Sequence, residues 1–311
     1  MTTALFETLD NLSARTKKKF ELMPKVISKD GNFDIGNLKI GDEWHRLSDV
    51  VAVMVDLKSS TNLAKGKNPR SVASIYDAGV GGVVVIFETF DADFVDIQGD
   101  GGFALFWGDR RYERAMAAAI TTRSFSDDFA TQLLAKWTES PKTGFKVAVA
   151  SGPVLVKRVG LPRHLELQEP VWAGRPVNYA AKAAQQTEPD ALLVTASVWD
   201  AIEDNDYIAF SCGCNSGPTL LWHDYDIEKI PDDEMYGKSL ETKWCVNHGE
   251  DFCQAILDGK TKRDDIPQSV RSERNLLSFG SVEKQDARKR RDLARVEWKA
   301  EHLSLIEELL K

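Results

Sequence analysis

Several features that would point to particular classes of protein are scarce or absent in this sequence. The chain has 311 residues, only four cysteines, and a net charge of −8 rather than a basic excess. An acidic balance argues against nucleic acid as a partner. No apolar run approaches the length that spans a membrane, and residues 1–4 lack the charged-then-apolar pattern of a signal peptide. We therefore expect a cytoplasmic protein without a nucleic acid or membrane partner.

The composition that is present is typical of a soluble globular protein. Hydrophobic residues make up 42% of the chain and charged residues 28%, which allows one large and one small domain. The order strand, helix, hairpin, helix, strand predicts a ferredoxin-like α+β domain over residues 45–210. We expect a helical extension before it (1–44), then a small cysteine-containing module (211–267) and a C-terminal helix (268–311).

An acidic residue follows the most apolar strand candidate of the chain. Residues 50–55 are apolar and rich in valine, which predicts a buried strand with Asp56 at its carboxyl end. Such an end faces a crevice. Ser59, Ser60 and Thr61 come next, and they can open a helix whose free backbone N–H groups hold an anion such as a phosphate.

A second acidic residue, Asp100, lies in a Gly-Asp-Gly-Gly turn between two predicted strands, 94–97 and 102–107. Taken singly, each aspartate is typical of a strand cap or a hairpin. If Asp100 meets Asp56, two carboxylates about 4 Å apart would repel by roughly 4 kcal/mol at an effective dielectric constant of 20. Divalent cations would remove that cost, and two Mg²⁺ ions held by two aspartates are suited to phosphoryl transfer.

A third motif makes the pattern specific. Residues 172–182 read Trp-Ala-Gly-Arg-Pro-Val-Asn-Tyr-Ala-Ala-Lys, and the spacing of four puts Asn178 and Lys182 on one face of a predicted helix. In order and spacing, the three segments resemble the catalytic domain of the class III nucleotidyl cyclases. That family has Asp-Ile-x-x-x-Thr, then Gly-Asp before an apolar strand, then Gly-x-x-Val-Asn-x-Ala-x-Arg. The resemblance implies an antiparallel sheet with helices on one face.

The resemblance also implies how a nucleotide would be held. Asp56 and Asp100 would bind two Mg²⁺ or Mn²⁺ ions, with the carbonyl of Leu57 as a further ligand. One ion would lower the pKa of the ribose 3′-hydroxyl and the other would hold the triphosphate. The backbone of residues 57–61 would cradle the phosphates.

Two further roles are implied for the third motif. Asn178 would orient the ribose, and Lys182 would neutralise charge on the α-phosphate. The family usually has arginine at the latter position, and lysine supplies the charge without the bidentate fork. Because cyclases of this class place the metal aspartates on one subunit and the asparagine and basic residue on the other, a homodimer with composite sites is implied.

The positions that read the base depart from the adenylate cyclase pattern. Those enzymes carry a lysine and an aspartate where this chain has Asp96 and Val171, which argues against ATP. Guanylate cyclases carry a glutamate at the first position, so Asp96 leaves GTP open. Its carboxylate can also accept a hydrogen bond from N3–H of uracil or from the amino group of cytosine. Alternatively, strand alternation turns Asp96 towards solvent.

The cysteines are confined to the last third of the chain. Cys-x-Cys at residues 212–214 and Cys-x-x-His at residues 245–248 indicate a structural Zn²⁺ rather than disulfides, with free thiols as the alternative. Which residues would bind the ion stays open among Cys212, Cys214, Cys245, His248 and Cys253.

The module at 211–267 resembles the sensor module beside bacterial defence cyclases, and the whole resembles the pyrimidine cyclases of Pycsar antiphage systems. This implies conversion of UTP, favoured over CTP, to a cyclic monophosphate that switches on a separate effector not held in a stable complex. The alternatives are a cytidylate or guanylate cyclase, or a domain that senses nucleotides without catalysis. The mixed-charge amphipathic stretch from residue 281 predicts a docking or dimer helix.

Overall fold

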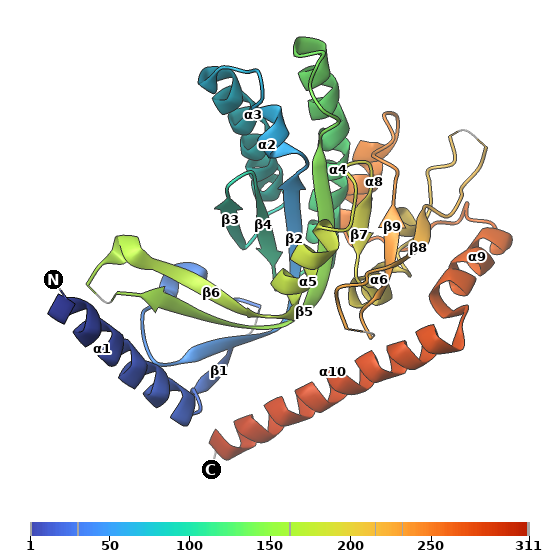
Figure 1. Cartoon of the computed structure of the whole chain (residues 1–311). Coiled ribbons are helices and arrows are strands. Elements are labelled where there is room, and N and C mark those ends of the chain that lie inside the picture. Colours follow the sequence, from blue (N-terminus) through green and yellow to red (C-terminus); the bar gives the residue numbers. More distant parts are fainter. Residues whose placement is uncertain (1, 30, 162, 215, 232, 310–311) are drawn as a thin grey trace.

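The computed structural model describes residues 2–29, 31–161, 163–214, 216–231 and 233–309, and a mixed sheet forms its centre (Figure 1). The strands lie in the order β3-β4-β2-β5-β7-β9-β8, with β1 beside β2 and β6 beside β5. In chain order they are β1 (Val26–Lys29), β2 (Trp44–Leu57), β3 (Phe94–Gln98), β4 (Gly101–Phe106), β5 (Phe145–Gly160), β6 (Gln168–Gly174), β7 (Leu192–Val194), β8 (Trp222–Asp226) and β9 (Tyr236–Leu240).

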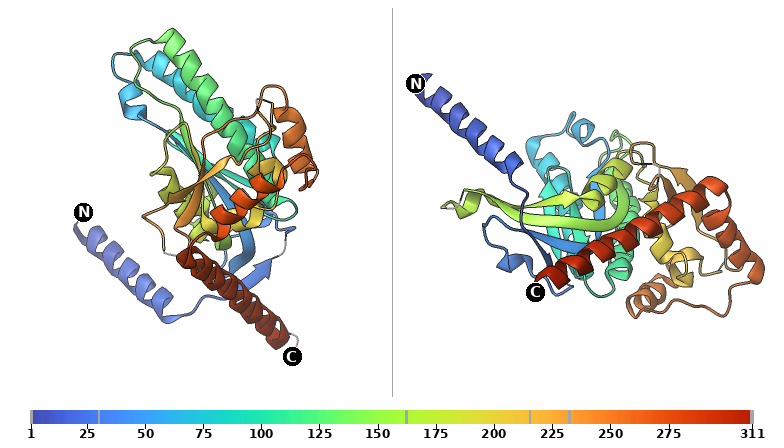
Figure 2. Two further views of the ribbon diagram at one scale, coloured as in Figure 1. Left: turned by 90° about the vertical axis from the view of Figure 1, so that its right-hand side faces the viewer. Right: turned by 90° about the horizontal axis from the view of Figure 1, so that it is seen from below.

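Helices pack on this sheet, and the described chain begins and ends with helices (Figures 1 and 2). They are α1 (Thr2–Glu21), α2 (Ser60–Leu63), α3 (Pro69–Thr89), α4 (Arg111–Lys136), α5 (Arg175–Ala184), α6 (Ala196–Ile202), α7 (Asp206–Ala209), α8 (Gly249–Leu257), α9 (Gln268–Phe279) and α10 (Val282–Leu309), with short 3₁₀ turns η1 (Ile35–Asn37) and η2 (Leu165–Leu167).

The α+β class predicted from the sequence is confirmed, although the sheet is mixed rather than wholly antiparallel. β1 runs parallel to β2, and β7 runs parallel to β5. The pairs β2–β4, β2–β5, β3–β4, β5–β6, β7–β9 and β8–β9 are antiparallel. Helix α5 connects β6 to β7 and carries the chain back along the sheet, so β7 enters in the same direction as β5.

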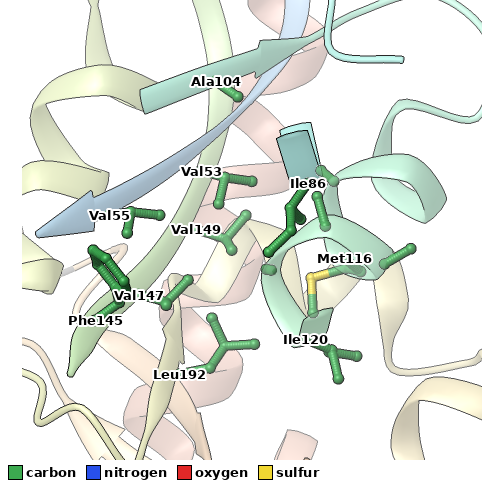
Figure 3. Close-up of a cluster of buried hydrophobic side chains, with 14 of the residues drawn as sticks. Val53, Val55, Ile86, Ala104, Met116, Ile120, Phe145, Val147, Val149 and Leu192 are labelled. Atoms are coloured by element: carbon green, nitrogen blue, oxygen red, sulfur yellow. The ribbon is translucent and has the colours of Figure 1, made fainter. Parts of the chain in front are cut away.

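Both faces of the central strands are covered, because β2 is apolar in both of its alternating sets of residues. Val53 and Val55 point to one face and join the core with Ile86 of α3 and Met116 of α4 (Figure 3). Ala52 points to the opposite face and packs in a second core cluster with Ala180 of α5, so helices cover the sheet on two faces instead of the one expected.

Residues 211–267 contribute strands to this same sheet. Leu192 of β7 pairs with Leu240 of β9, and Trp222 of β8 pairs with Leu240 from the other side. The sheet therefore continues past residue 210, and the four-part division of the chain remains a prediction.

The segment expected to form one C-terminal helix consists of two, α9 and α10. The break falls at Gly280 and Ser281, where the Ser281 hydroxyl accepts a hydrogen bond from the backbone N–H of Lys284. Figure 2 shows α10 running across the underside of the molecule, while α1 projects away from the sheet.

One helix, α3, is long and apolar enough by length and composition to cross a membrane. Its Ile75, Val83 and Phe87 are buried in the core cluster against the sheet. A core helix of a globular domain passes the same test, so this finding adds little weight to a membrane role.

Candidate active site

The two aspartates singled out from the sequence lie together at one end of the sheet. Asp56 is next to the last residue of β2 and pairs with Gly101 of β4, so Asp100 at the tip of the β3–β4 hairpin is adjacent to it (Figure 1). Gly99 supplies the left-handed conformation of the turn, with φ of +65°. A Cβ at Gly101 would lie 2.3 Å from the carbonyl oxygen of Val55, so only glycine lets the hairpin approach β2 this closely.

One basic residue, Lys146 on the neighbouring strand β5, lies beside this acidic pair. Burial raises the pKa of the Asp56 carboxyl, the charge of Asp100 raises it further, and Lys146 opposes both. Among the described residues, neither carboxylate is held by a hydrogen bond or by an ion pair within 4.0 Å. Two converging carboxylates that are not tied up by such bonds form a donor set that suits a hard divalent cation.

The segment after Asp56 turns sharply into α2. The backbone of Lys58 is occupied, because its N–H donates to the Gly144 carbonyl and its carbonyl accepts from Thr143 Oγ1. Ser59 is left-handed, with φ of +61°, and its carbonyl accepts the first bonds of the helix. The N–H groups of Ser59, Ser60 and Thr61 have no backbone partner among the described residues, so three donors are available in the segment that follows Asp56.

The third motif forms α5, which starts directly after β6. Asn178 donates from Nδ2 to the Gly174 carbonyl at 3.1 Å, one turn earlier, and both Asn178 and Lys182 are exposed. In the described chain no hydrogen bond or ion pair connects either residue to Asp56 or Asp100. The described contacts therefore do not join the two halves of the predicted site directly within one chain.

Side chains on neighbouring strands of the β3–β4 hairpin lie on the same sheet face as Asp56. Asp96 of β3 pairs with Phe103 of β4, which pairs with Met54 of β2, and these three share the sheet face of Asp56. Asp96 is half-buried, and its Oδ2 accepts a hydrogen bond from Gln98 Nε2 at 2.9 Å. Asp96 thus lies on the same sheet face as Asp56, while its role in reading the base stays a prediction.

Comparisons with known proteins identify the family. No family model matches the chain. A uridylate cyclase of Micromonospora echinofusca is 52% identical over 247 residues, which cover 78% of this chain and 81% of the relative. A uridylate cyclase of Propioniciclava tarda is 44% identical over 292 residues, covering 92% and 94%. The chain belongs to the uridylate cyclase family.

Solved structures support the cyclase fold. The adenylyl cyclase CyaB from P. aeruginosa has a TM-score of 0.52 at 13% identity, covering 72% of this chain and all of that one. The catalytic core of a rhodopsin-guanylyl cyclase with converted specificity, in complex with ATPαS, has a TM-score of 0.50 at 13% identity, covering 64% of this chain and 98% of that one. The resemblance to class III cyclases drawn from the three motifs is therefore confirmed, and the protein is a nucleotidyl cyclase.

Within this cyclase, Val171 is not brought to Asp96. Val171 pairs with Lys157 on β5 and is 42% exposed. The next residue, Trp172, turns the other way and packs on Phe94 of β3, with ring centroids 5.1 Å apart. Trp172, and not Val171, therefore packs beside β3.

Gln98 was missed in the sequence analysis although a signal was available. Period-two alternation from Asp96 puts Gln98 on the same strand face, two residues further along β3. The side-chain amide of Gln98 donates a hydrogen bond to the Asp96 carboxylate, so this face of β3 carries both hydrogen-bond donors and acceptors.

The cysteine module of the cyclase also contains a compact group of polar atoms. Ligand atoms of Cys212, Cys214, Cys245 and His248 all lie within 4.8 Å of one another. Cys253, the fifth residue proposed, lies outside this group and packs at the edge of the hydrophobic core.

Proposed function

We propose that this cyclase converts UTP to 3′,5′-cyclic UMP and pyrophosphate. The observation that carries the proposal is the convergence of Asp56 and Asp100 beside three free backbone N–H groups. Two relatives named uridylate cyclases, similar over most of the chain, support UTP as the substrate.

The donor set of Asp56 and Asp100 fits two Mg²⁺ or Mn²⁺ ions, because the charge of one carboxylate acts on the other and neither is held by a hydrogen bond or ion pair among the described residues. The Leu57 carbonyl would be a further ligand. Bound there, the ions would acidify the ribose 3′-hydroxyl and offset the charge of the triphosphate.

The chain's own groups would position the nucleotide. The N–H groups of Ser59, Ser60 and Thr61 would hold phosphate oxygens, and Asn178 would orient the ribose. In the reaction, the 3′-oxygen bonds to the α-phosphorus, the bond to the bridging oxygen breaks, and pyrophosphate leaves with the electron pair. The hydroxyl proton passes to solvent. The Lys182 ammonium would stabilise charge developing on the α-phosphate.

The base would lie against the face of β3 that carries Asp96 and Gln98. The Asp96 carboxylate would accept the uracil N3–H, and the bond from Gln98 fixes its orientation. CTP and GTP remain alternative substrates for a carboxylate at this position.

We also infer that the enzyme works as a homodimer. Asn178 and Lys182 are exposed and unconnected to the aspartates of their own chain, which supports sites shared between two subunits. By resemblance to Pycsar cyclases, the product would act as a cytoplasmic second messenger in antiphage defence, received by a separate effector.

One assay tests both activity and base choice. The protein is incubated with ATP, GTP, CTP or UTP and Mn²⁺, and the products are separated by chromatography. We expect cyclic UMP from UTP, while cyclic CMP or cyclic GMP as the main product would replace UTP by CTP or GTP. No product from any nucleotide would favour the nucleotide-sensing alternative.

Two variants make this assay specific to the β3 face. Asp96→Ala should lower kcat/KM for UTP by roughly tenfold, because a charge-assisted hydrogen bond to the base is lost. Ile97→Ala is the matched control, since Ile97 points to the other side of the same strand. An equal effect of both variants would remove Asp96 from base recognition.

A further inference from the structure

A cluster of three thiols and one imidazole lies far in sequence from the cyclase motifs. Cys214 is at its centre, with its sulfur 2.9 Å from Cys212 Sγ, 3.4 Å from Cys245 Sγ and 2.9 Å from His248 Nδ1. Cys245 Sγ and His248 Nδ1 are 3.9 Å apart. All four ligand atoms lie within 4.8 Å of one another, so they form one cluster rather than two separate pairs.

This geometry suits a tetrahedral zinc ion. With Zn–S of about 2.3 Å and Zn–N of about 2.0 Å, neighbouring ligand atoms around one ion are about 3.5–3.8 Å apart. Small outward movements of Cys212 and His248 from Cys214 would give these spacings. The donor set of three thiolates and one imidazole is typical of closed structural zinc sites.

A disulfide explains the cluster less well. The 2.9 Å between the sulfurs of Cys212 and Cys214 exceeds the bond length of about 2.05 Å in a disulfide. Such a bond would also involve only two of the four groups, and it would not explain why Cys245 and His248 lie beside them. All the cysteines are free in the structure.

The local backbone is shaped to bring these ligands together. Gly213, between the first two cysteines, is left-handed with φ of +78°, and a Cβ there would lie 2.9 Å from Pro218 N. In the second segment, the Gly249 N–H donates to the Cys245 carbonyl at 2.7 Å, which turns the chain so that His248 faces back towards Cys245.

The second segment is anchored to the body of the enzyme. The backbone N–H of Trp244 donates to Ser124 Oγ, and its indole N–H donates to Thr121 Oγ1 at 2.8 Å, both on α4. The first segment follows α7 and has no such anchor to α4 among the described hydrogen bonds. The Ser211 carbonyl of this first segment instead accepts a hydrogen bond from Arg263 Nη1 at 2.8 Å. A shared ion would therefore add a direct link between this loop and the segment anchored to α4.

We propose that Cys212, Cys214, Cys245 and His248 bind a structural Zn²⁺, which fastens the loop after α7 to the segment before α8. With four protein ligands the ion has no open position, so it takes no part in the cyclase reaction. Both segments also line a cavity of about 750 Å³ against α4, so the ion shapes the wall of that cavity.

Metal content of the full-length protein is the first test. Elemental analysis of the purified protein should find about one zinc per chain in the unaltered protein and in Cys253→Ser, and almost none in Cys214→Ser. Cys253 is the matched control, because it is a free cysteine of the same module outside the cluster. Absence of zinc from the unaltered protein, or equal loss in both variants, would overturn the proposal.

A second measurement does not depend on a variant that folds. The unaltered protein is stripped with a chelator and titrated with Co²⁺, and we expect an intense sulfur-to-cobalt charge-transfer band with the visible bands of tetrahedral Co²⁺. Zn²⁺ should displace the cobalt. Spectra of octahedral cobalt without a charge-transfer band, or a thiol count that falls by two because of a disulfide, would contradict the site.

Discussion

Asp56 is the residue at which the requirements of stability and of the proposed reaction conflict. Burial and the nearby charge of Asp100 raise its pKa, so the folded protein favours the protonated carboxyl more than the unfolded chain does. The stability this carboxyl contributes is present at low pH and is lost as the pH rises through its folded pKa. The ionised form of Asp56 therefore lowers the stability of the metal-free enzyme.

Asp56→Asn should for this reason stabilise the metal-free protein at pH 7 while abolishing turnover. We expect the free energy of unfolding to rise by roughly 0.2–1 kcal/mol, the range for a like-charge pair on adjacent strands. Mn²⁺ should raise the melting temperature of the unaltered protein and leave that of the variant unchanged. Thermal denaturation with and without Mn²⁺ measures both effects.

Asp128→Asn serves as the control, because Asp128 is exposed on α4 and lies outside the site. If the Asp56 variant retained near-normal cyclase activity, or if Mn²⁺ stabilised it as much as the unaltered protein, the metal assignment would fail.

Among the elements, α10 docks through its basic residues. Arg291 donates from Nε and Nη2 to Asp200 Oδ2 at 3.0 and 2.8 Å, and both side chains are only 6% exposed. Arg288 pairs with Glu203 at 2.7 Å. The apolar side chains Leu293 and Val296 are exposed instead. The sequence predicted a docking or dimer helix, and the first half of α10 docks on α6 of its own chain.

Arg291→Ala should destabilise the protein by roughly 3 kcal/mol, because it removes both hydrogen bonds to the buried Asp200 Oδ2 and leaves only Arg288, at 3.6 Å from Oδ1, to offset the carboxylate. Urea unfolding of the full chain measures this loss. Lys289→Ala is matched in helix and charge, and its pair with Asp286 is exposed, so it should change stability by less than about 0.5 kcal/mol. Similar losses in the two variants would show that the ion pair does not anchor α10.

The features that sequence predicted well are those fixed by short-range patterns. The valine run ending at Asp56 and the glycine turn at Asp100 are local, and strand and hairpin formed there as expected. The pairing of β9 with β7 and the packing of α5 on the second face depend on contacts between distant segments, so periodicity could not give them. Likewise, 31 residues separate Cys214 from Cys245, and only the folded chain excludes Cys253 from the cluster.

At the scale of the whole molecule, we expect the proposed site to be shared between two copies of the chain. Asp56 and Asp100 lie at the carboxyl end of β2, whereas Lys182 is on α5 and has no described contact with them. Leu5, Leu9 and Leu12 of α1 are each at least half exposed on a helix that projects from the sheet. The exposed Lys182 and the exposed leucines of α1 are features expected of a chain that forms a symmetric dimer with two shared sites.

This organisation predicts that two inactive variants restore each other. Asp56→Ala and Lys182→Ala should each be nearly inactive alone, but a heterodimer of the two contains one site with an intact aspartate pair and an intact lysine. Random pairing after co-expression makes about half of the dimers mixed, each with one of two sites intact, so about a quarter of normal activity should return. Product formation per chain measures this recovery of activity, with all dimers assembled under identical conditions. Co-expression of Asp56→Ala with Asp100→Ala is the control and should restore no activity, because both changes fall in the same half-site. If the Asp56 and Lys182 variants also restored no activity although mixed dimers form, the two halves would have to act within one chain.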